Sequence, residues 1–276
     1  MNKSTIKTFD AVIIGSGPGG GTVARELSRQ GKKVLLLERG KDPKIKGTLF
    51  QTLPLFQQFK TTGKATIQTQ SVAGGTTFSF CAVALDPPYE KLNAYGMDLK
   101  EDIAETKKEL GIAPLPDELI GPMSHRIMES AQGLGLDWQK IPKFIDSSKC
   151  RPGCWRCFYN CPYGAKWTAR KFAVEAADNG GEFKTSAHVE TVLIENGKAV
   201  GVVYSENNKK IKAEAPCVII SAGGLFSPKL LEKLGIDDVG KDFFCDPLLF
   251  VTGFVKGANE GLREIPMSAG INFSEE

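Results

Sequence analysis

The 276-residue sequence contains no apolar run near the roughly 18 residues that a membrane-spanning helix needs. Its first ten residues, MNKSTIKTFD, lack the apolar core of a secretory signal. Neither sign of charge dominates, because 35 basic and 32 acidic residues give a net charge of +3. These absences predict a cytoplasmic protein without a transmembrane segment, and they give no indication of nucleic-acid binding.

Histidine is also scarce, since only His125 and His188 are present. His125 falls within a predicted helix and has no partner close in the sequence, while His188 opens a predicted strand. Both are interpreted as structural residues. The sequence therefore offers no candidate for a general base, the role that histidine most often fills.

Glycine, by contrast, is abundant, at 30 of 276 residues, or about 11% against a usual ~7%. A dense group lies in DAVIIGSGPGGGTVARELSRQGKKVLLLERG, residues 10–40. Two short apolar runs in it predict buried parallel strands, and the residues between them predict a helix. The predicted order is strand, glycine loop, helix and strand, over residues 11–14, 15–20, 22–30 and 33–37.

Gly15, Gly17 and Gly20 have the G-x-G-x-x-G spacing of a dinucleotide-binding turn. Gly15 permits the tight turn, Gly17 lets the backbone approach a pyrophosphate, and Gly20 lets the helix pack closely on the strand. Free N–H groups at the start of the helix would hold the phosphates. Glu38 lies 18 residues after Gly20, where a carboxylate accepts hydrogen bonds from a ribose and would repel the 2′-phosphate of NADP.

Two later glycine pairs fit the same ligand. Gly74-Gly75, followed by threonine hydroxyls, suits a backbone that passes a ring or a phosphate, although an ordinary turn is the alternative. The apolar residues 218–220 predict a buried strand that runs into Ser221-Ala222-Gly223-Gly224. A helix is predicted over 227–234, with Ser227 as its N-cap and Pro228 at its first position.

The other predicted elements are placed by periodicity and turn residues. Residues 41–70 are polar and predict a connection with one short helix. Asn196-Gly197 predicts a tight hairpin within a β-meander. The meander strands are predicted over 188–195, 199–204 and 209–213, and further helices over 99–110, 123–134 and 167–179.

Four of the seven cysteines are concentrated at Cys150, Cys154, Cys157 and Cys161. In a reducing compartment such crowding favours metal or cluster binding over disulfides. The last three, followed by proline, match the end of the bacterial ferredoxin ligand run, which favours an Fe–S cluster. The alternatives are a zinc site and no metal at all, with reduced thiols or a local disulfide packing the loop.

With these motifs in this order, the chain resembles the FAD-dependent glucose–methanol–choline (GMC) oxidoreductases, in the cysteine-rich branch of gluconate and glucose dehydrogenases. Four matches carry the resemblance: VIIGSGPGGGTVA…LLLERG, AGGTT at 73–77, the meander with Val189, and SAGGLFSPKLLEKLGI at 221–236. Two departures occur in the last segment. Gly224 stands where a small non-glycine residue is usual, and Leu234-Gly235 replaces Ser-Gly.

The resemblance implies an α/β fold, with a Rossmann-like FAD-binding domain of the glutathione reductase type, a β-meander and a mostly helical or irregular insert. It implies an FAD-binding domain over 6–80 and 165–245, a cysteine-bearing insert over 81–164, and the start of an incomplete substrate domain over 246–276. The expected FAD-binding residues are Gly15, Gly17, Gly19, Gly20, Glu38, Arg39, Gly74, Gly75, Thr76, Val189, Ala222 and Gly223. The expected metal ligands are Cys150, Cys154, Cys157 and Cys161.

The implied reaction is hydride transfer from a CH–OH group of an alcohol or sugar to FAD, with electrons passed on through an Fe–S cluster to an unknown acceptor. Family members are considerably longer and carry their catalytic histidine near the C-terminus, where nothing here aligns. The chain therefore looks like an N-terminal half: a truncated product, one subunit of a split enzyme, or a chain that has lost the chemistry. A partner chain that supplies the C-terminal substrate domain is expected.

Two other functions remain open from the sequence. One is a flavin and Fe–S electron-transfer subunit without alcohol chemistry. The other is a non-enzymatic nucleotide-binding fragment that holds zinc or no metal.

Overall fold

The computed structural model describes residues 7–63, 66–243, 249, 251–253, 255–256 and 263–272. The chain divides into two compact units. Unit 1 comprises Met1–Lys44, Leu53–Phe78 and Thr168–Phe250, and unit 2 comprises Ile45–Thr52, Ser79–Trp167 and Val251–Glu276. Both units are therefore discontinuous in sequence.

Unit 1 is built on a parallel four-stranded sheet with the strand order β13-β2-β3-β9. The strands are β2 (Ala11–Ile14), β3 (Val34–Leu37), β9 (Glu182–Lys184) and β13 (Cys217–Ile220). Helices α1 (Pro18–Arg29) and α6 (Arg170–Asp178) pack together on one face of this sheet. Every residue of β2 and β3 is buried.

The two faces of β2 and β3 explain why these strands are apolar at every position. Val12 and Ile14 point to one face, where they join a core with the β-meander, while Ala11 and Ile13 point to the other, toward α1 and α6. Successive side chains of a strand alternate between faces. A strand that is covered on both sides has no polar position left, which is the expected pattern of a parallel sheet.

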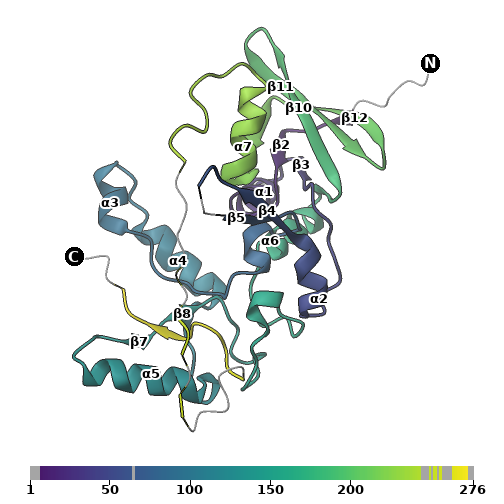
Figure 1. Ribbon diagram of the computed structural model, residues 1–276. Helices are drawn as coiled ribbons and strands as arrows, with labels where there is room; N and C mark the ends of the chain where they lie inside the picture. The colour runs from purple at the N-terminus through teal and green to yellow at the C-terminus, as the bar shows by residue number, and fades with distance from the viewer. Residues whose placement is uncertain are drawn as a thin grey trace. The chain divides into compact units, whose positions relative to one another are not determined.

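The β-meander is an antiparallel sheet that covers the second face, and Figure 1 shows its strands β10 and β11 side by side. Asn196 and Gly197 both have positive φ, at 51° and 75°, so the predicted Asn-Gly hairpin turn is confirmed. The strand order is β1-β12-β11-β10. The strands are β1 (Lys7–Thr8), β10 (Ala187–Glu195), β11 (Lys198–Glu206) and β12 (Lys209–Glu214).

Two further elements complete unit 1. Strands β4 (Phe56–Lys60) and β5 (Thr66–Gln70) form an antiparallel hairpin. Helix α7 (Gly223–Glu232) follows β13 directly.

In its described residues, unit 2 contains α-helices, two-stranded strand pairs and its own core. Its helices are α2 (Leu49–Thr52), α3 (Tyr89–Ala94), α4 (Lys100–Leu110) and α5 (Pro122–Gly133). Its strand pairs are β6 (Ala113–Pro114) with β8 (Pro142–Lys143), and β7 (Gln139–Lys140) with β14 (Ala269–Gly270). The fully buried Lys143 donates hydrogen bonds from Nζ to the carbonyls of Cys81, Pro266 and Met267 at 2.6, 2.9 and 2.8 Å.

The α/β fold class is confirmed, but three local predictions were wrong. Residues 41–70 contain the predicted short helix, α2, but also the β4–β5 hairpin, which was not predicted. The strand over 218–220 is only half-buried, because β13 is the edge strand of its sheet. Helix α7 begins at Gly223 with Ala222 as its N-cap, so Ser227 is no cap and Pro228 lies inside the helix.

Residues 45–52 belong to unit 2, within the range predicted for the FAD-binding domain. Much of the range 246–276 lies outside the described residues, so that part of the domain prediction stays a prediction. Among the helices that the structure describes, none is both long enough and apolar enough to cross a membrane.

Candidate functional site

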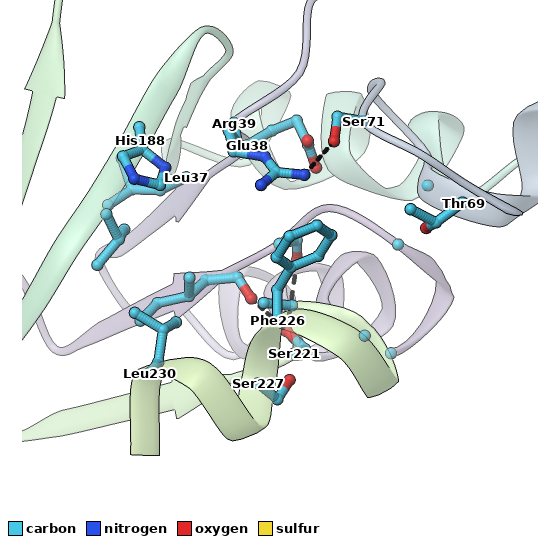
Figure 2. Close-up of a pocket in the computed structure, with 18 of the residues that line it drawn as sticks. Leu37, Glu38, Arg39, Thr69, Ser71, His188, Ser221, Phe226, Ser227 and Leu230 are labelled. Carbon is cyan, nitrogen blue, oxygen red and sulfur yellow. Dashed lines mark hydrogen bonds between the residues drawn. The ribbon is translucent and has the colours of Figure 1, made fainter. Parts of the chain in front are cut away.

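A cavity of about 650 Å³ lies in unit 1 at the carboxyl ends of β2, β3 and β13. In open α/β sheets this edge is where ligands bind. The volume is within the range of small-molecule and cofactor sites. Figure 2 shows its wall, to which the strand ends, the hairpin, the meander and α7 all contribute.

Two helices begin at this cavity, and neither beginning is capped by a side chain. Helix α1 has Gly17 as its N-cap and α7 has Ala222, with no acidic residue in the first turn of either. Gly17 and Ala222 both line the cavity. Uncapped N–H groups and the positive ends of two helix dipoles therefore face the same space, and such an arrangement binds an anion.

Glycine is required where these two helix beginnings meet. A Cβ on Gly15, which has a φ of +100°, would lie 2.4 Å from the carbonyl oxygen of Ser221. A Cβ on Gly20 would lie 1.9 Å from the carbonyl oxygen of Gly15. The Ser221 N–H also donates to the carbonyl of Ile14 at 2.9 Å. The predicted convergence of the two strand–glycine–helix segments is thus confirmed.

Gly17 differs from its neighbours, because a Cβ there would meet nothing within 4 Å. Gly17 lines the cavity, so the missing methyl group leaves room for a ligand and not for protein atoms. Gly75, with a φ of +56°, lies against it, since a Cβ on Gly75 would come 2.8 Å from the Cα of Gly17. The glycine loop of residues 73–77 is therefore packed on the first one, and Thr76 lines the cavity beside it.

A buried network centred on Ser16 joins these loops to Glu38. The Glu38 Oε2 accepts hydrogen bonds from the Ser16 N–H at 3.0 Å and from its hydroxyl at 2.7 Å, and Oε1 accepts one from Gly40 at 2.7 Å. The Ser16 hydroxyl in turn accepts one from the Gly74 N–H at 3.2 Å. A carboxylate can accept about four such bonds, so one acceptor position of Glu38 remains for a ligand hydroxyl.

Arg39 and Phe226 form a stacked pair in the wall. The guanidinium carbon lies 3.8 Å from the centre of the Phe226 ring. Arg39 also donates hydrogen bonds to the hydroxyl of Ser71 and, at 3.1 Å, to Oε1 of Gln57. Figure 2 shows Arg39 and Phe226 facing each other, with Ser71 beside the guanidinium.

The meander supplies the far end of the cavity through Ala187, His188 and Val189. Burial, and then the positive charges of Arg39 and Lys233, lower the pKa of His188, so its imidazole is neutral at pH 7. The Nζ of Lys233, at the end of α7, donates to the carbonyl of Glu190 at 3.1 Å and ties the helix to the meander.

Most of the site residues predicted from the sequence lie in this wall. They are Gly15, Gly17, Gly19, Glu38, Arg39, Gly75, Thr76, Val189, Ala222 and Gly223. Gly20 and Gly74 lie behind it, where they allow the loops to pack. Sequence reasoning missed Ser16, the hairpin residues, His188 and the residues of α7. If the helix had been predicted to begin at Gly223, its periodicity would have placed Phe226, Leu230 and Lys233 on one face.

The four predicted metal ligands lie in unit 2 and do not form a metal site as placed. Within the described ranges, no three His, Cys, Asp or Glu side chains are arranged so that they could hold a metal ion. As they are placed in this structure, residues 150–161 therefore do not form a metal site.

The fold and cavity define an α/β protein of the dinucleotide-binding, Rossmann-like class, and a model of the NAD(P)-binding Rossmann-like domain matches residues 13–45. The model of the GMC oxidoreductase N-terminal domain matches residues 85–248. The chain therefore belongs to the GMC oxidoreductase family, as the resemblance predicted.

Similar proteins include an uncharacterised GMC-type oxidoreductase of Mycobacterium tuberculosis H37Rv, which is 27% identical over 97% of this chain and 46% of its own length. The long-chain-alcohol oxidase FAO4B of Arabidopsis thaliana is 26% identical over 89% of this chain and 37% of its own. Among solved structures, pyridoxine 4-oxidase from Mesorbium loti has a TM-score of 0.64 and 17% identity, covering 80% of this chain and 51% of that one. The chain thus spans about half the length, or less, of these relatives.

Proposed function

We propose that the cavity of unit 1 binds FAD, and that the protein of which this chain is part oxidises an alcohol or sugar. The observation that carries the proposal is that α1 and α7 both begin, without a side-chain cap, at residues of the cavity wall, Gly17 and Ala222. A pyrophosphate between them would receive N–H groups from both helices. The space beside Gly17, which a Cβ would enter, supports the fit of a dinucleotide.

Different residues would hold the ribose and the base in the adenosine diphosphate half of FAD. The remaining acceptor position of the Glu38 carboxylate would take a ribose hydroxyl. The apolar end lined by Leu37, Val189 and Leu230 would take the base. We propose unit 1 as the FAD-binding domain on these grounds.

Bound FAD would supply the hydride acceptor for a substrate CH–OH group. Membership in the GMC family supports this reaction, and the named relatives include a long-chain-alcohol oxidase. The proton of the substrate hydroxyl would then need a base. His188 lies at the adenosine end of the proposed site, beside Val189, and so is not a candidate for that base.

We propose that the substrate domain and the base come from residues beyond this sequence, on a partner chain. The length of the relatives, of which this chain spans 46% and 37% in the two examples above, supports this proposal. The cysteine loop has no part in the mechanism proposed here, because its thiols do not fit a cluster as placed. A dehydrogenase that passed its electrons through an Fe–S cluster would have to contain iron and acid-labile sulfide.

The proposal is tested by purifying the chain under mild, anaerobic conditions and recording its absorption spectrum with and without added FAD. A bound flavin spectrum and saturable quenching of FAD fluorescence support the site. Colourless protein that does not quench added FAD contradicts it. Iron and acid-labile sulfide are measured in the same sample, and turnover of an alcohol is assayed with the partner chain present.

A further inference from the structure

An apolar groove in unit 2 has no role in the function proposed so far. The groove has a volume of about 280 Å³ and lies between α4 and residues 84–87; it is called the α4 groove below. We propose that the α4 groove is the docking site of the partner chain, which places one large apolar side chain in the groove and a basic residue beside it. The inference deepens the proposed function and rests on the partner chain proposed there.

Two walls of unit 2 enclose the α4 groove. One wall is a face of the helix, on which Leu99, Ile103 and Lys107 follow one another at intervals of about one turn. The other wall is the segment 84–87. The Nζ of Lys107 reaches across and lies 2.6 Å from Oδ1 of Asp86, so an ion pair joins the two walls.

The floor of the groove is anchored in the core of unit 2. Phe144 lines the groove, and its ring stacks on the Trp167 ring with the centroids 5.4 Å apart. The Phe80 ring lies against it at 5.7 Å, and the Phe144 N–H donates to the carbonyl of Ala82 at 2.8 Å. The groove is therefore preformed, and docking into it costs little ordering of the chain.

The helices beside the groove lack the packing that stabilises most helices. Neither α3 nor α4 buries a side chain in the part of the chain that the structure describes. A helix as short as α4 is marginal in water, and most helical stability in proteins comes from packing of an apolar face. Leu85 on the groove wall is 52% exposed, and Met97 near Leu99 is 45% exposed. Such an exposed apolar surface indicates an interaction site.

The size of the groove and the length of the relatives point to a protein as the occupant. The volume is below the roughly 300–1,000 Å³ of ligand pockets, so it suits one large side chain and not a cofactor. Side chains that fill such pockets carry most of the binding energy of an interface. This chain spans 46% and 37% of the mycobacterial and Arabidopsis relatives, so more than half of each has no counterpart in it.

The charge at the groove defines the chemistry of the partner. Asp86 is already paired with Lys107, whereas Asp102 on the same wall has no basic partner within 4 Å among the described residues. Asp102 therefore favours a lysine or arginine next to the apolar side chain that enters the groove. At the rim of an interface, such a pair acts chiefly on the rate of association.

The probe for the test is the partner chain that restores alcohol turnover in the assay above, and its binding is measured by isothermal titration calorimetry. Ile103→Asp puts a charge in the groove, and Ile103→Ala removes the apolar side chain while keeping a strong helix former. Ile127→Asp is the matched control, because Ile127 is 47% exposed on α5 of the same unit and does not line the groove. Thermal unfolding and the Kd for FAD check that every variant is folded.

Ile103→Asp is expected to raise the Kd for the partner chain about 30-fold and Ile103→Ala about fivefold, while Ile127→Asp keeps it within about twofold. Asp102→Lys is expected to slow association about fivefold at low salt, in stopped-flow measurements, and to lose this effect at about 0.5 M salt. Glu101→Lys makes the same charge change outside the groove and should slow association less than about twofold. The Kd for FAD should not change in any of them.

An unchanged Kd for the partner chain in folded Ile103→Asp or Ile103→Ala protein overturns the inference. Equal weakening by Ile127→Asp also overturns it, because the effect would then not belong to the groove. So does dimerisation of the chain alone that Ile103→Asp abolishes, since a second copy would then cover the groove. If no added chain restores turnover, the proposed partner is refuted and the inference with it, whereas failure to bind FAD refutes the flavin site alone.

Discussion

Gly17 and Gly20 are three residues apart in one loop, yet replacing each by alanine should have opposite consequences. A methyl group on Gly17 meets no protein atom within 4 Å, whereas one on Gly20 would lie 1.9 Å from the Gly15 oxygen and 2.5 Å from the Ser221 hydroxyl. Gly17 has φ of −63° and ψ of −176°, which alanine adopts without strain.

Gly17→Ala should therefore fold as well as the original chain, or be more stable by up to about 1 kcal/mol, because alanine restricts the unfolded state. Its methyl group would hold a pyrophosphate away from the N–H groups of α1. Each lost hydrogen bond to a charged group is worth about 1.5–3 kcal/mol, so the Kd for FAD should rise about 10- to 100-fold. Gly20→Ala should lose about 3 kcal/mol or more of stability, since backbone atoms have to move.

The assays are urea unfolding without flavin, for stability, and FAD fluorescence quenching, for affinity. Gly19→Ala is a control for stability only, because a Cβ there meets only the Ser221 Cβ, at 4.0 Å. Full FAD affinity in Gly17→Ala would show that no phosphate passes this residue, and the geometric reasoning would be wrong. Unchanged stability in Gly20→Ala would contradict the close packing of the Gly20 Cα against the Gly15 carbonyl.

Three further perturbations test the supporting structure. Ser16→Ala removes the hydroxyl that joins Glu38 to Gly74 and should cost about 1–3 kcal/mol in urea unfolding, against little effect for Ser148→Ala at an exposed position. The pKa of His188 is lowered in the folded chain, so the unfolded chain takes up the proton first as the pH falls through about 6.5, and stability is lost on acidification. His188→Asn should make the free energy of unfolding less dependent on pH below about 6.5. Lys143→Met leaves three carbonyls in unit 2 without their donor and should cost about 3 kcal/mol, measured by thermal unfolding, whereas an unchanged midpoint would show that the carbonyls find other donors.

Local sequence patterns were sufficient to predict the strands that are covered on both faces. The runs Ala11–Ile14 and Val34–Leu37 carry no polar residue, and such a run can only be satisfied inside a covered parallel sheet. Asn196-Gly197 specified its turn because few residues adopt positive φ at both positions. The spacing of Gly15, Gly17 and Gly20 specified the loop for the same local reason.

The edge position of β13 and the start of α7 depended on neighbours that no local pattern reveals. A valine–isoleucine run reads the same at the centre and at the edge of a sheet, so its exposure was decided by strand order. Proline is most common in the first turn of a helix, which is why Pro228 suggested a helix start. In the structure α7 begins five residues before Pro228, shortly after β13 ends at the cavity.

By itself, the sequence determined the class of fold and the two glycine segments, because glycine spacing and uninterrupted apolar runs express constraints that act within a few residues. Only the tertiary structure decided that Ser16 joins Glu38 to Gly74, that His188 lines the cavity, and that Arg39 stacks on Phe226. These groups are 22 to 187 residues apart in the chain, and they meet because parallel strands bring their carboxyl ends to one edge of the sheet.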